Sequence, residues 1–140
     1  MLKFNEYGIL PSGIHKVKLN EFEKLFSFNH KRLEMIQKGL TPFLKELKPY
    51  KLKEIYMDGS FVTQKENPDD IDGYALSEST SALSEFIVNN QDRWQSEYRI
   101  DFNPAFSDFE GEYSQSWWEE FFSSIPHKQS LQKGFVALAF

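Results

Sequence analysis

The chain has 140 residues, a length typical of a single domain that can bury a sizeable hydrophobic core. Hydrophobic residues make up 40% and charged residues 26% of it, which excludes a disordered chain. The formal net charge of −5 argues against a protein that coats nucleic acid, because that function needs clustered lysine and arginine.

A turn signal separates the first residues from the rest of the chain. The sequence Leu10-Pro11-Ser12-Gly13 favours a tight turn, so we predict an N-terminal arm over residues 1–18 and a single domain over residues 19–140. Asn20 is suited to begin a short helix that ends near Phe26, because an asparagine side chain can accept hydrogen bonds from the free N–H groups of a first helical turn.

A longer helical segment is predicted to begin at Asn29. Gly39 and Pro42 interrupt it, so two helices that meet at a kink are expected there. Apolar residues recur along the segment every three or four positions, which predicts one buried stripe. The stripe consists of Leu33, Ile36, Leu40, Phe43, Leu44 and Leu47.

Strands and helices alternate in the remainder of the chain. We predict strands at residues 54–58, 71–76, 97–103 and 134–140, a helix from Ser79 or Ser81 to about Asn89, and a short helix from Ser116. This order is typical of an α/β (α+β) fold in which helices pack against a mixed β-sheet.

Composition also bounds the cellular setting. Cysteine is absent, which excludes disulfides and thiol chemistry and fits a reducing compartment. The first residues contain no continuous apolar stretch of the kind that a signal peptide needs. No apolar run approaches the length of a membrane span. We therefore expect a cytoplasmic protein without a membrane partner.

One short segment contains residues suited to metal and phosphate chemistry. Asp70 and Asp72 flank Ile71, and side chains two positions apart in a strand point to the same face. Two neighbouring carboxylates repel each other unless a cation joins them, so the pair predicts a divalent metal site. Gly59 and Ser60 follow the strand at 54–58 and would offer backbone N–H groups and a hydroxyl to an anion.

Asp101 is a third candidate acid, because it lies within a predicted strand among apolar neighbours, where an unpaired carboxylate is costly to bury. Thr63 and Lys65 lie in the loop between the first two strands and could add phosphate contacts. A lysine in such a loop is more often simply solvated, and an aspartate on an edge strand is often a surface residue, so these alternatives stay open.

The strand, Gly59-Ser60, nine intervening residues and Asp70-Ile71-Asp72 together resemble the signature of the nucleotidyltransferase superfamily that includes DNA polymerase beta. The match is nearest to minimal nucleotidyltransferases of the antitoxin type, and within them to a small group with Asp-Gly-Ser-Phe and Asp-Ile-Asp patterns. In commoner minimal members the loop after Gly-Ser contains arginines, which the sequence Phe61-Val62-Thr63-Gln64-Lys65 does not match.

The resemblance implies a nucleotidyltransferase-like sheet and a set of site roles. Asp70, Asp72 and Asp101 would bind two Mg²⁺ ions, and Asp101 would help to activate the attacking hydroxyl. Gly59 and Ser60 would hold the triphosphate of a nucleoside triphosphate, with ATP as the expected nucleotide.

The implied reaction is transfer of a nucleoside monophosphate to a hydroxyl, for which a partner protein is the preferred acceptor, as in toxin–antitoxin systems. An alternative is an inactive protein of the same fold that masks a partner through the aromatic residues of its last helix, Trp117, Trp118, Phe121 and Phe122. A further alternative is a tRNA-modifying nucleotidyltransferase, which the acidic balance of the chain disfavours.

Overall fold

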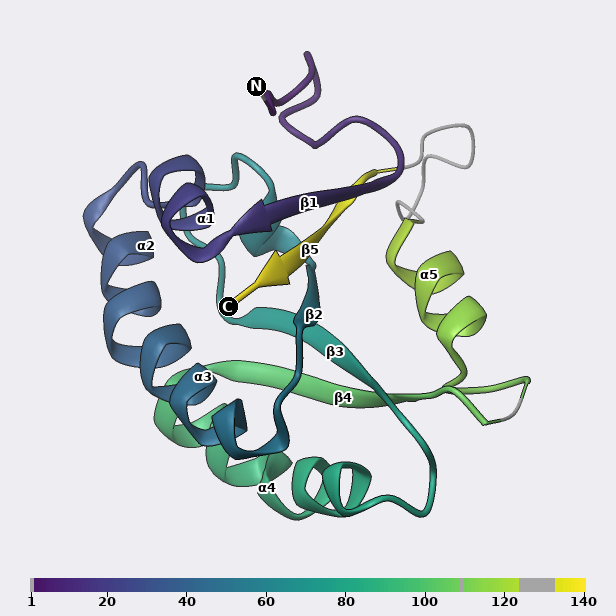
Figure 1. The fold of residues 1–140 in the computed structure, drawn as a ribbon. Coiled ribbons are helices and arrows are strands. Elements are labelled where there is room, and N and C mark those ends of the chain that lie inside the picture. The colour runs from purple at the N-terminus through teal and green to yellow at the C-terminus, as the bar shows by residue number, and fades with distance from the viewer. Residues whose placement is uncertain (1, 109, 124–132) are drawn as a thin grey trace.

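The computed structural model describes residues 2–108, 110–123 and 133–140. Within these residues a five-stranded mixed sheet has the strand order β1-β5-β2-β3-β4 (Figure 1). The strands are β1 Ile14–Lys18, β2 Glu54–Asp58, β3 Ile71–Ser77, β4 Ile100–Phe106 and β5 Phe135–Ala139. Strands β1 and β5 run parallel, as do β3 and β4, whereas β2 is antiparallel to both of its neighbours.

Helices cover both faces of this sheet, and the predicted mixed α+β fold class is confirmed (Figure 1). The helices are α1 Leu19–Phe26, α2 His30–Met35, the π-helix η1 Ile36–Leu40, α3 Thr41–Leu47, the 3-10 helices η2 Lys48–Tyr50 and η3 Ser60–Val62, α4 Ala82–Tyr98 and α5 Gln115–Ser123. Among the helices described, none combines the length and the apolar composition needed to cross a membrane.

The sheet has a different core on each face because successive strand residues point to opposite sides. Ile71 and Ile100 belong to the larger core, which the apolar residues of α1 to α4 complete. Tyr74 and Tyr56 belong to the smaller core, in which Trp118 of α5 packs over the sheet. The ring centroids of Tyr74 and Trp118 are 6.1 Å apart in a stacked arrangement. Trp118 is therefore a core residue and not part of an exposed aromatic surface.

The helical stripe predicted from Asn29 onward is largely confirmed, and a π-helix stands at the expected kink. Asn29 begins α2 by accepting a hydrogen bond from the backbone N–H of Arg32 at 2.9 Å. At Gly39 in η1, a β-carbon would lie 2.5 Å from the carbonyl oxygen of Tyr98, so the glycine lets this segment pack directly on the end of α4.

The boundary between α4 and β4 differs from the prediction. The sequence pattern predicts a helix end near Asn89 and a strand start at residue 97, and both positions are wrong: α4 ends at Tyr98 and β4 begins at Ile100. Trp94 and Tyr98 lie one helical turn apart and both donate to Glu46 of α3, so packing extends the helix through the polar sequence between them. Arg99 ends it in the left-handed region, with φ 55°.

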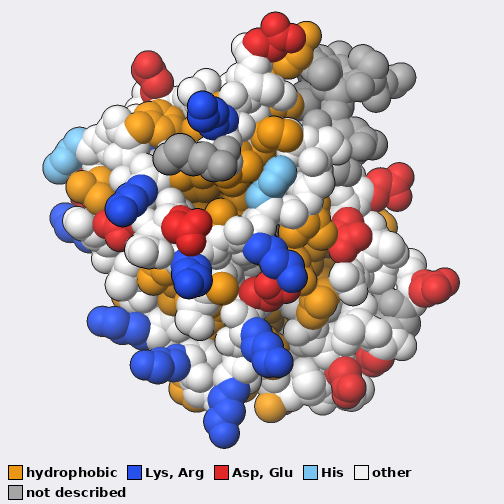
Figure 2. All heavy atoms as spheres, turned by 45° about the horizontal axis from the view of Figure 1, so that its top comes forward, with side chains coloured by type: hydrophobic (Ala, Val, Ile, Leu, Met, Phe, Trp, Pro, Cys, Tyr) orange, Lys and Arg blue, Asp and Glu red, His pale blue; other side chains and the backbone are white. Residues whose placement is uncertain are grey.

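Strand β1 is a second difference. The turn signal predicts that residues 14–18 belong to an arm, whereas in the structure they form an edge strand that pairs with β5. Only Val17 of this strand is buried, so the hydrophobic alternation is too weak to reveal it. Lys16 and Lys18 are exposed on it, and lysines on an edge strand disfavour pairing with another chain. Lysine and arginine side chains are spread, among acidic ones, over the face shown in Figure 2.

Candidate metal centre

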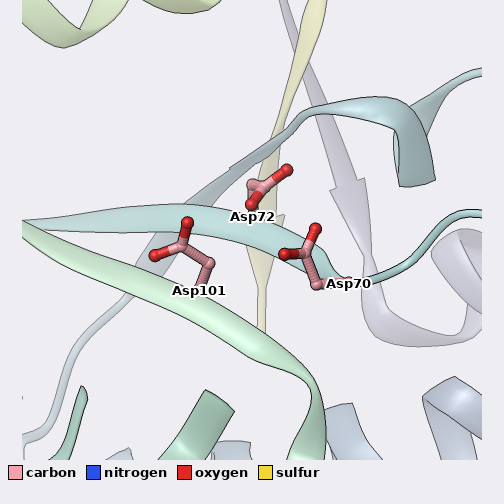
Figure 3. A group of neighbouring side chains, drawn as sticks. All are labelled: Asp70, Asp72 and Asp101. Atoms are coloured by element: carbon pink, nitrogen blue, oxygen red, sulfur yellow. The ribbon is translucent and has the colours of Figure 1, made fainter. Parts of the chain in front are cut away.

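Three carboxylates from adjacent strands meet at one end of the sheet (Figure 3). Asp70 immediately precedes β3, Asp72 is the second residue of β3, and Asp101 lies directly beside Asp72 in the parallel pairing of β3 with β4. Each residue offers a carboxylate oxygen, and these three oxygens lie within 4.8 Å of one another. Ile71, which stands between Asp70 and Asp72 in the sequence, is fully buried in the larger core. The structure thus brings together the three carboxylates that the sequence pattern indicates.

The electrostatics of this cluster favour a bound cation. Burial, followed by the negative charges of Asp70, Asp101 and Asp58, raises the pKa of Asp72 from its ordinary value of 3.8 to about 8. Partial removal from water and the charge of Asp70 also raise the pKa of Asp101, although its side chain remains exposed on one side. Ionising all three acids together is therefore unfavourable without a counter-charge. A donor set made only of carboxylate oxygens suits a hard cation such as Mg²⁺.

Gly59 is required by the position of Asp72. Its backbone has φ +78°, and a β-carbon on it would lie 2.0 Å from Oδ2 of Asp72. Only glycine meets both conditions without displacing the carboxylate. Ser60 follows as the first residue of η3 and is half-buried. The predicted Gly-Ser turn is thus in direct contact with the acid cluster.

The other two predicted loop residues have different surroundings. The hydroxyl of Thr63 donates to the carbonyl oxygen of Ser60 at 2.6 Å and accepts from the backbone N–H of Lys65 at 3.1 Å, so it stabilises the loop itself. Lys65 has an exposed side chain. Phosphate contacts from these two residues stay a prediction.

Asp58 is a fourth carboxylate at this end of the sheet, and sequence reasoning does not include it in the site. It ends β2 and lies opposite Asp72 in the antiparallel pairing with β3. It is 1% exposed, and Nζ of Lys133 lies 3.5 Å from its Oδ1. Burial raises the pKa of Asp58 to about 6, although the charge of Lys133 opposes that shift. The local signal was an acid at the end of an apolar strand; its lysine partner is 75 positions away and gives no such signal.

Arg32 is the second residue of interest that sequence reasoning misses. It is the third residue of α2, it is fully buried, and its guanidinium donates to backbone carbonyl groups of the loop between β2 and β3. Its position four residues before Ile36 was a usable signal, because that spacing places an arginine on the buried stripe of the helix.

The smaller core lies on the same face of the sheet as Asp72. Tyr74 is two residues after Asp72 in β3 and therefore lies on the same face, with Trp118 of α5 stacked on it. Trp117 is half-buried. The side chains of Phe121 and Phe122, which the masking hypothesis also uses, lie outside the described part of the structure. Aromatic residues thus lie on the same face of the sheet as Asp72, and two of them, Tyr74 and Trp118, are buried.

Comparison with known proteins gives one match. The model of a family described as "Family of unknown function (DUF6932)" matches residues 2–139, so the chain belongs to this family. Neither the curated proteins nor the solved structures contain a match. The function is accordingly inferred from the geometry of the site.

Proposed function

We propose that this protein is a metal-dependent nucleotidyltransferase, which transfers a nucleoside monophosphate from a nucleoside triphosphate, with ATP as the expected donor, to a hydroxyl group. One observation carries the proposal: three carboxylate oxygens within 4.8 Å of one another lie beside a turn in which Gly59 directly faces Asp72. A carboxylate cluster next to a glycine turn suits a substrate that combines phosphates with a divalent cation.

The residues divide into two roles. Asp70, Asp72 and Asp101 would hold Mg²⁺, with two ions expected, and the bound metal would offset the charge of the phosphates and favour ionisation of the attacking hydroxyl. Gly59 would let the backbone approach the triphosphate closely, and Ser60 would bind it through its backbone N–H group and its hydroxyl. The acceptor oxygen would form a bond to the α-phosphorus as the bond to pyrophosphate breaks, and the hydroxyl proton would pass to Asp101 or to water.

The proposed acceptor is a hydroxyl of a partner protein in the cytoplasm, as the resemblance to antitoxin-type enzymes implies. The surroundings of Asp101 are compatible with a bulky acceptor. Its side chain is exposed and β4 is an edge strand, so one side of the acid cluster is open to solvent. A small molecule would more commonly be bound in an enclosed pocket.

Calorimetric titration of ATP, GTP, CTP and UTP with Mg²⁺ tests the donor site. The wild type is compared with Asp70→Ala/Asp72→Ala and with Asp69→Ala, a control that removes an exposed neighbouring acid. We expect binding of at least one nucleotide by the wild type and the control, and none by the double variant. Binding that survives in the double variant would contradict the proposal.

Transfer is tested separately with ATP labelled at the α- or the γ-phosphorus in the presence of cell extract. Nucleotidyl transfer moves the α-label to the acceptor, whereas phosphoryl transfer moves the γ-label. Label in protein supports the preferred acceptor, and label in RNA supports the tRNA-modifying alternative. Absence of both nucleotide binding and transfer would favour the masking protein, whose function the Asp70→Ala/Asp72→Ala variant would retain.

A further inference from the structure

The guanidinium of Arg32 is enclosed by backbone carbonyl groups. It donates to Phe61 at 2.7 Å, to Thr63 at 2.8 Å and, through Nε, to Lys65 at 2.9 Å. Longer bonds reach the carbonyl oxygens of Ser60, at 3.3 Å, and of Phe26, at 3.1 Å. Four of these five acceptors belong to the loop that follows Gly59, so one side chain links most of that loop to α2.

The positively charged guanidinium of Arg32 contacts aromatic rings and not a carboxylate. Its Cζ lies 4.2 Å from the ring centroid of Phe28 and 4.8 Å from that of Phe61, so two aromatic rings contact the cation. Among the residues described, no aspartate or glutamate forms an ion pair with it. Burial lowers the pKa of Arg32 to about 10, which leaves the group protonated at pH 7. A full positive charge is thus buried directly beneath the loop.

The contacts also orient the loop peptides. In a planar trans peptide the C=O and N–H groups point in opposite directions. The carbonyl groups of Ser60 and Phe61 point toward Arg32, so the N–H groups of the next two residues, Phe61 and Val62, point away from it. The negative ends of these peptide dipoles therefore face the buried cation, and their positive ends face the opposite side.

We propose that Arg32 is a positioning residue for phosphate binding. Its hydrogen bonds hold the loop from Gly59 to Lys65 in shape. Its positive charge, on the side of the loop that faces α2, adds to that of Lys65, the one cation of the loop itself. The inference rests on the proposed function, since the phosphates in question are those of the nucleotide. The charge stands on α2, whereas the loop itself contributes no cation except Lys65.

Three variants separate this role from general support of the fold. Arg32→Lys keeps the charge but loses the planar set of donors, and Arg32→Met removes both. Lys31→Met is the control, because it deletes a cation from the neighbouring position of the same helix. The probes are Mg²⁺-tripolyphosphate, Mg²⁺-ATP and Mn²⁺ alone, with binding measured by calorimetry and folding followed by circular dichroism.

We expect Arg32→Lys to weaken binding of tripolyphosphate and ATP by about tenfold, while Mn²⁺ affinity and the Lys31→Met control change by less than about threefold. Arg32→Met should weaken phosphate binding further; if it does not fold, the comparison of Arg32→Lys with the wild type decides. Wild-type phosphate affinity in Arg32→Lys, or an equal loss of phosphate and Mn²⁺ binding, would overturn the inference.

The same probes distinguish failure of the inference from failure of the proposed function. Tripolyphosphate binding that depends on Arg32, without any nucleotidyl transfer, supports the inference and contradicts the function. Transfer activity in the wild type, with unchanged phosphate affinity in the Arg32 variants, supports the proposed function and contradicts the inference. A wild type that binds Mn²⁺ but neither tripolyphosphate nor ATP overturns the inference.

Discussion

Gly59 and Asp72 are in such close contact that any side chain on residue 59 would overlap the carboxylate: its β-carbon would stand 2.0 Å from Oδ2. The contact joins the end of β2 to the second residue of β3 and so sets the distance between the Gly-Ser turn and the three acids. A candidate phosphate loop and a candidate metal cluster are thereby in direct contact.

Gly59→Ala should therefore damage the site more than the fold. The new methyl group must displace Asp72, so we expect Mn²⁺ affinity to fall by at least about tenfold, a loss of roughly 1.4 kcal/mol. Gly111→Ala is the matched control, because Gly111 also has a positive φ, +107°, but among the residues described none would come within 4 Å of its new methyl group. Equal effects of the two substitutions on metal affinity would show that backbone strain alone is responsible.

Asp72→Asn should stabilise the metal-free protein. The pKa of Asp72 is raised to about 8 in the folded state, so its contribution favours folding at low pH and is lost as the pH rises from about 4 through 8. At pH 9 in EDTA we expect the variant to melt roughly 3–5 °C above the wild type, the shift that about 1 kcal/mol produces in a chain of this size.

Millimolar Mg²⁺ should reverse that order, because a cation that binds only the folded wild type raises its melting temperature. Thermal melts at pH 5, 7 and 9, with EDTA or Mg²⁺, measure both effects. An Asp72→Asn variant that melts below the wild type in EDTA at every pH would contradict the electrostatic account of the cluster.

Lys133→Met should leave the buried Asp58 without its cation. Removing one partner of a buried ion pair costs about 3–5 kcal/mol, so the free energy of unfolding should fall by roughly that amount at pH 8. The loss should diminish as the pH falls toward 6, because Lys133 lowers the pKa of Asp58, and without it the acid takes up a proton at a higher pH than in the wild type, where the pKa is about 6.

The double variant Lys133→Met/Asp58→Asn should recover most of the stability at pH 8, because no buried charge remains at this pair. Denaturant unfolding at both pH values measures this recovery, with Lys65→Met as a control on an exposed lysine. A double variant no more stable than Lys133→Met would mean that the lysine acts through packing alone.

Glu46→Gln should lower stability at neutral pH but not in acid. Glu46 forms an ion pair with Arg93 and accepts from Tyr98 at 2.6 Å, and these contacts, led by Arg93, lower its pKa to about 2. Its contribution is present above its ordinary pKa of 4.5 and is lost as the pH falls toward 2. We expect a cost of about 1–3 kcal/mol at pH 7.

Glu34→Gln is the comparison for that prediction. Glu34 is half exposed and pairs with His30 and Lys38 of its own helical segment, so its loss should cost under about 0.5 kcal/mol. Urea titrations at pH 7 and pH 2.5 provide the measurement. A pH-independent difference between wild type and Glu46→Gln would place the effect in helix packing instead of charge.

The acid cluster could be predicted because its determinants are local or nearly so. Asp70 and Asp72 are two positions apart, and Asp101 stands within an apolar strand, so alternation alone indicates which way each side chain points. By contrast, the ion pair of Asp58 with Lys133 joins residues 75 positions apart in the sequence, and no spacing rule predicts it. Arg32 was missed because a charged residue on a buried stripe conflicts with the usual pattern.

The element boundaries that were predicted wrongly have a common cause. The segment at 97–103 alternates like a strand, but Glu46 of α3 binds two residues of the turn that ends α4 and holds them in the helix. Strand β1 has one buried residue, and its pairing with β5 depends on a segment more than 100 positions later. Tertiary contacts therefore outweigh local preference at both places.

The position of β5 has a consequence for how the chain acquires its structure during synthesis. Strand β5, residues 135–139, lies between β1 and β2, so β1 and one edge of β2 lack their partner strand until these residues have left the ribosome, whereas the other edge of β2 can already pair with β3. Until then β1 has no partner strand and β2 exposes one edge, both open to pairing with other chains. The sheet that holds the acid cluster is thus completed only when β5 inserts between β1 and β2.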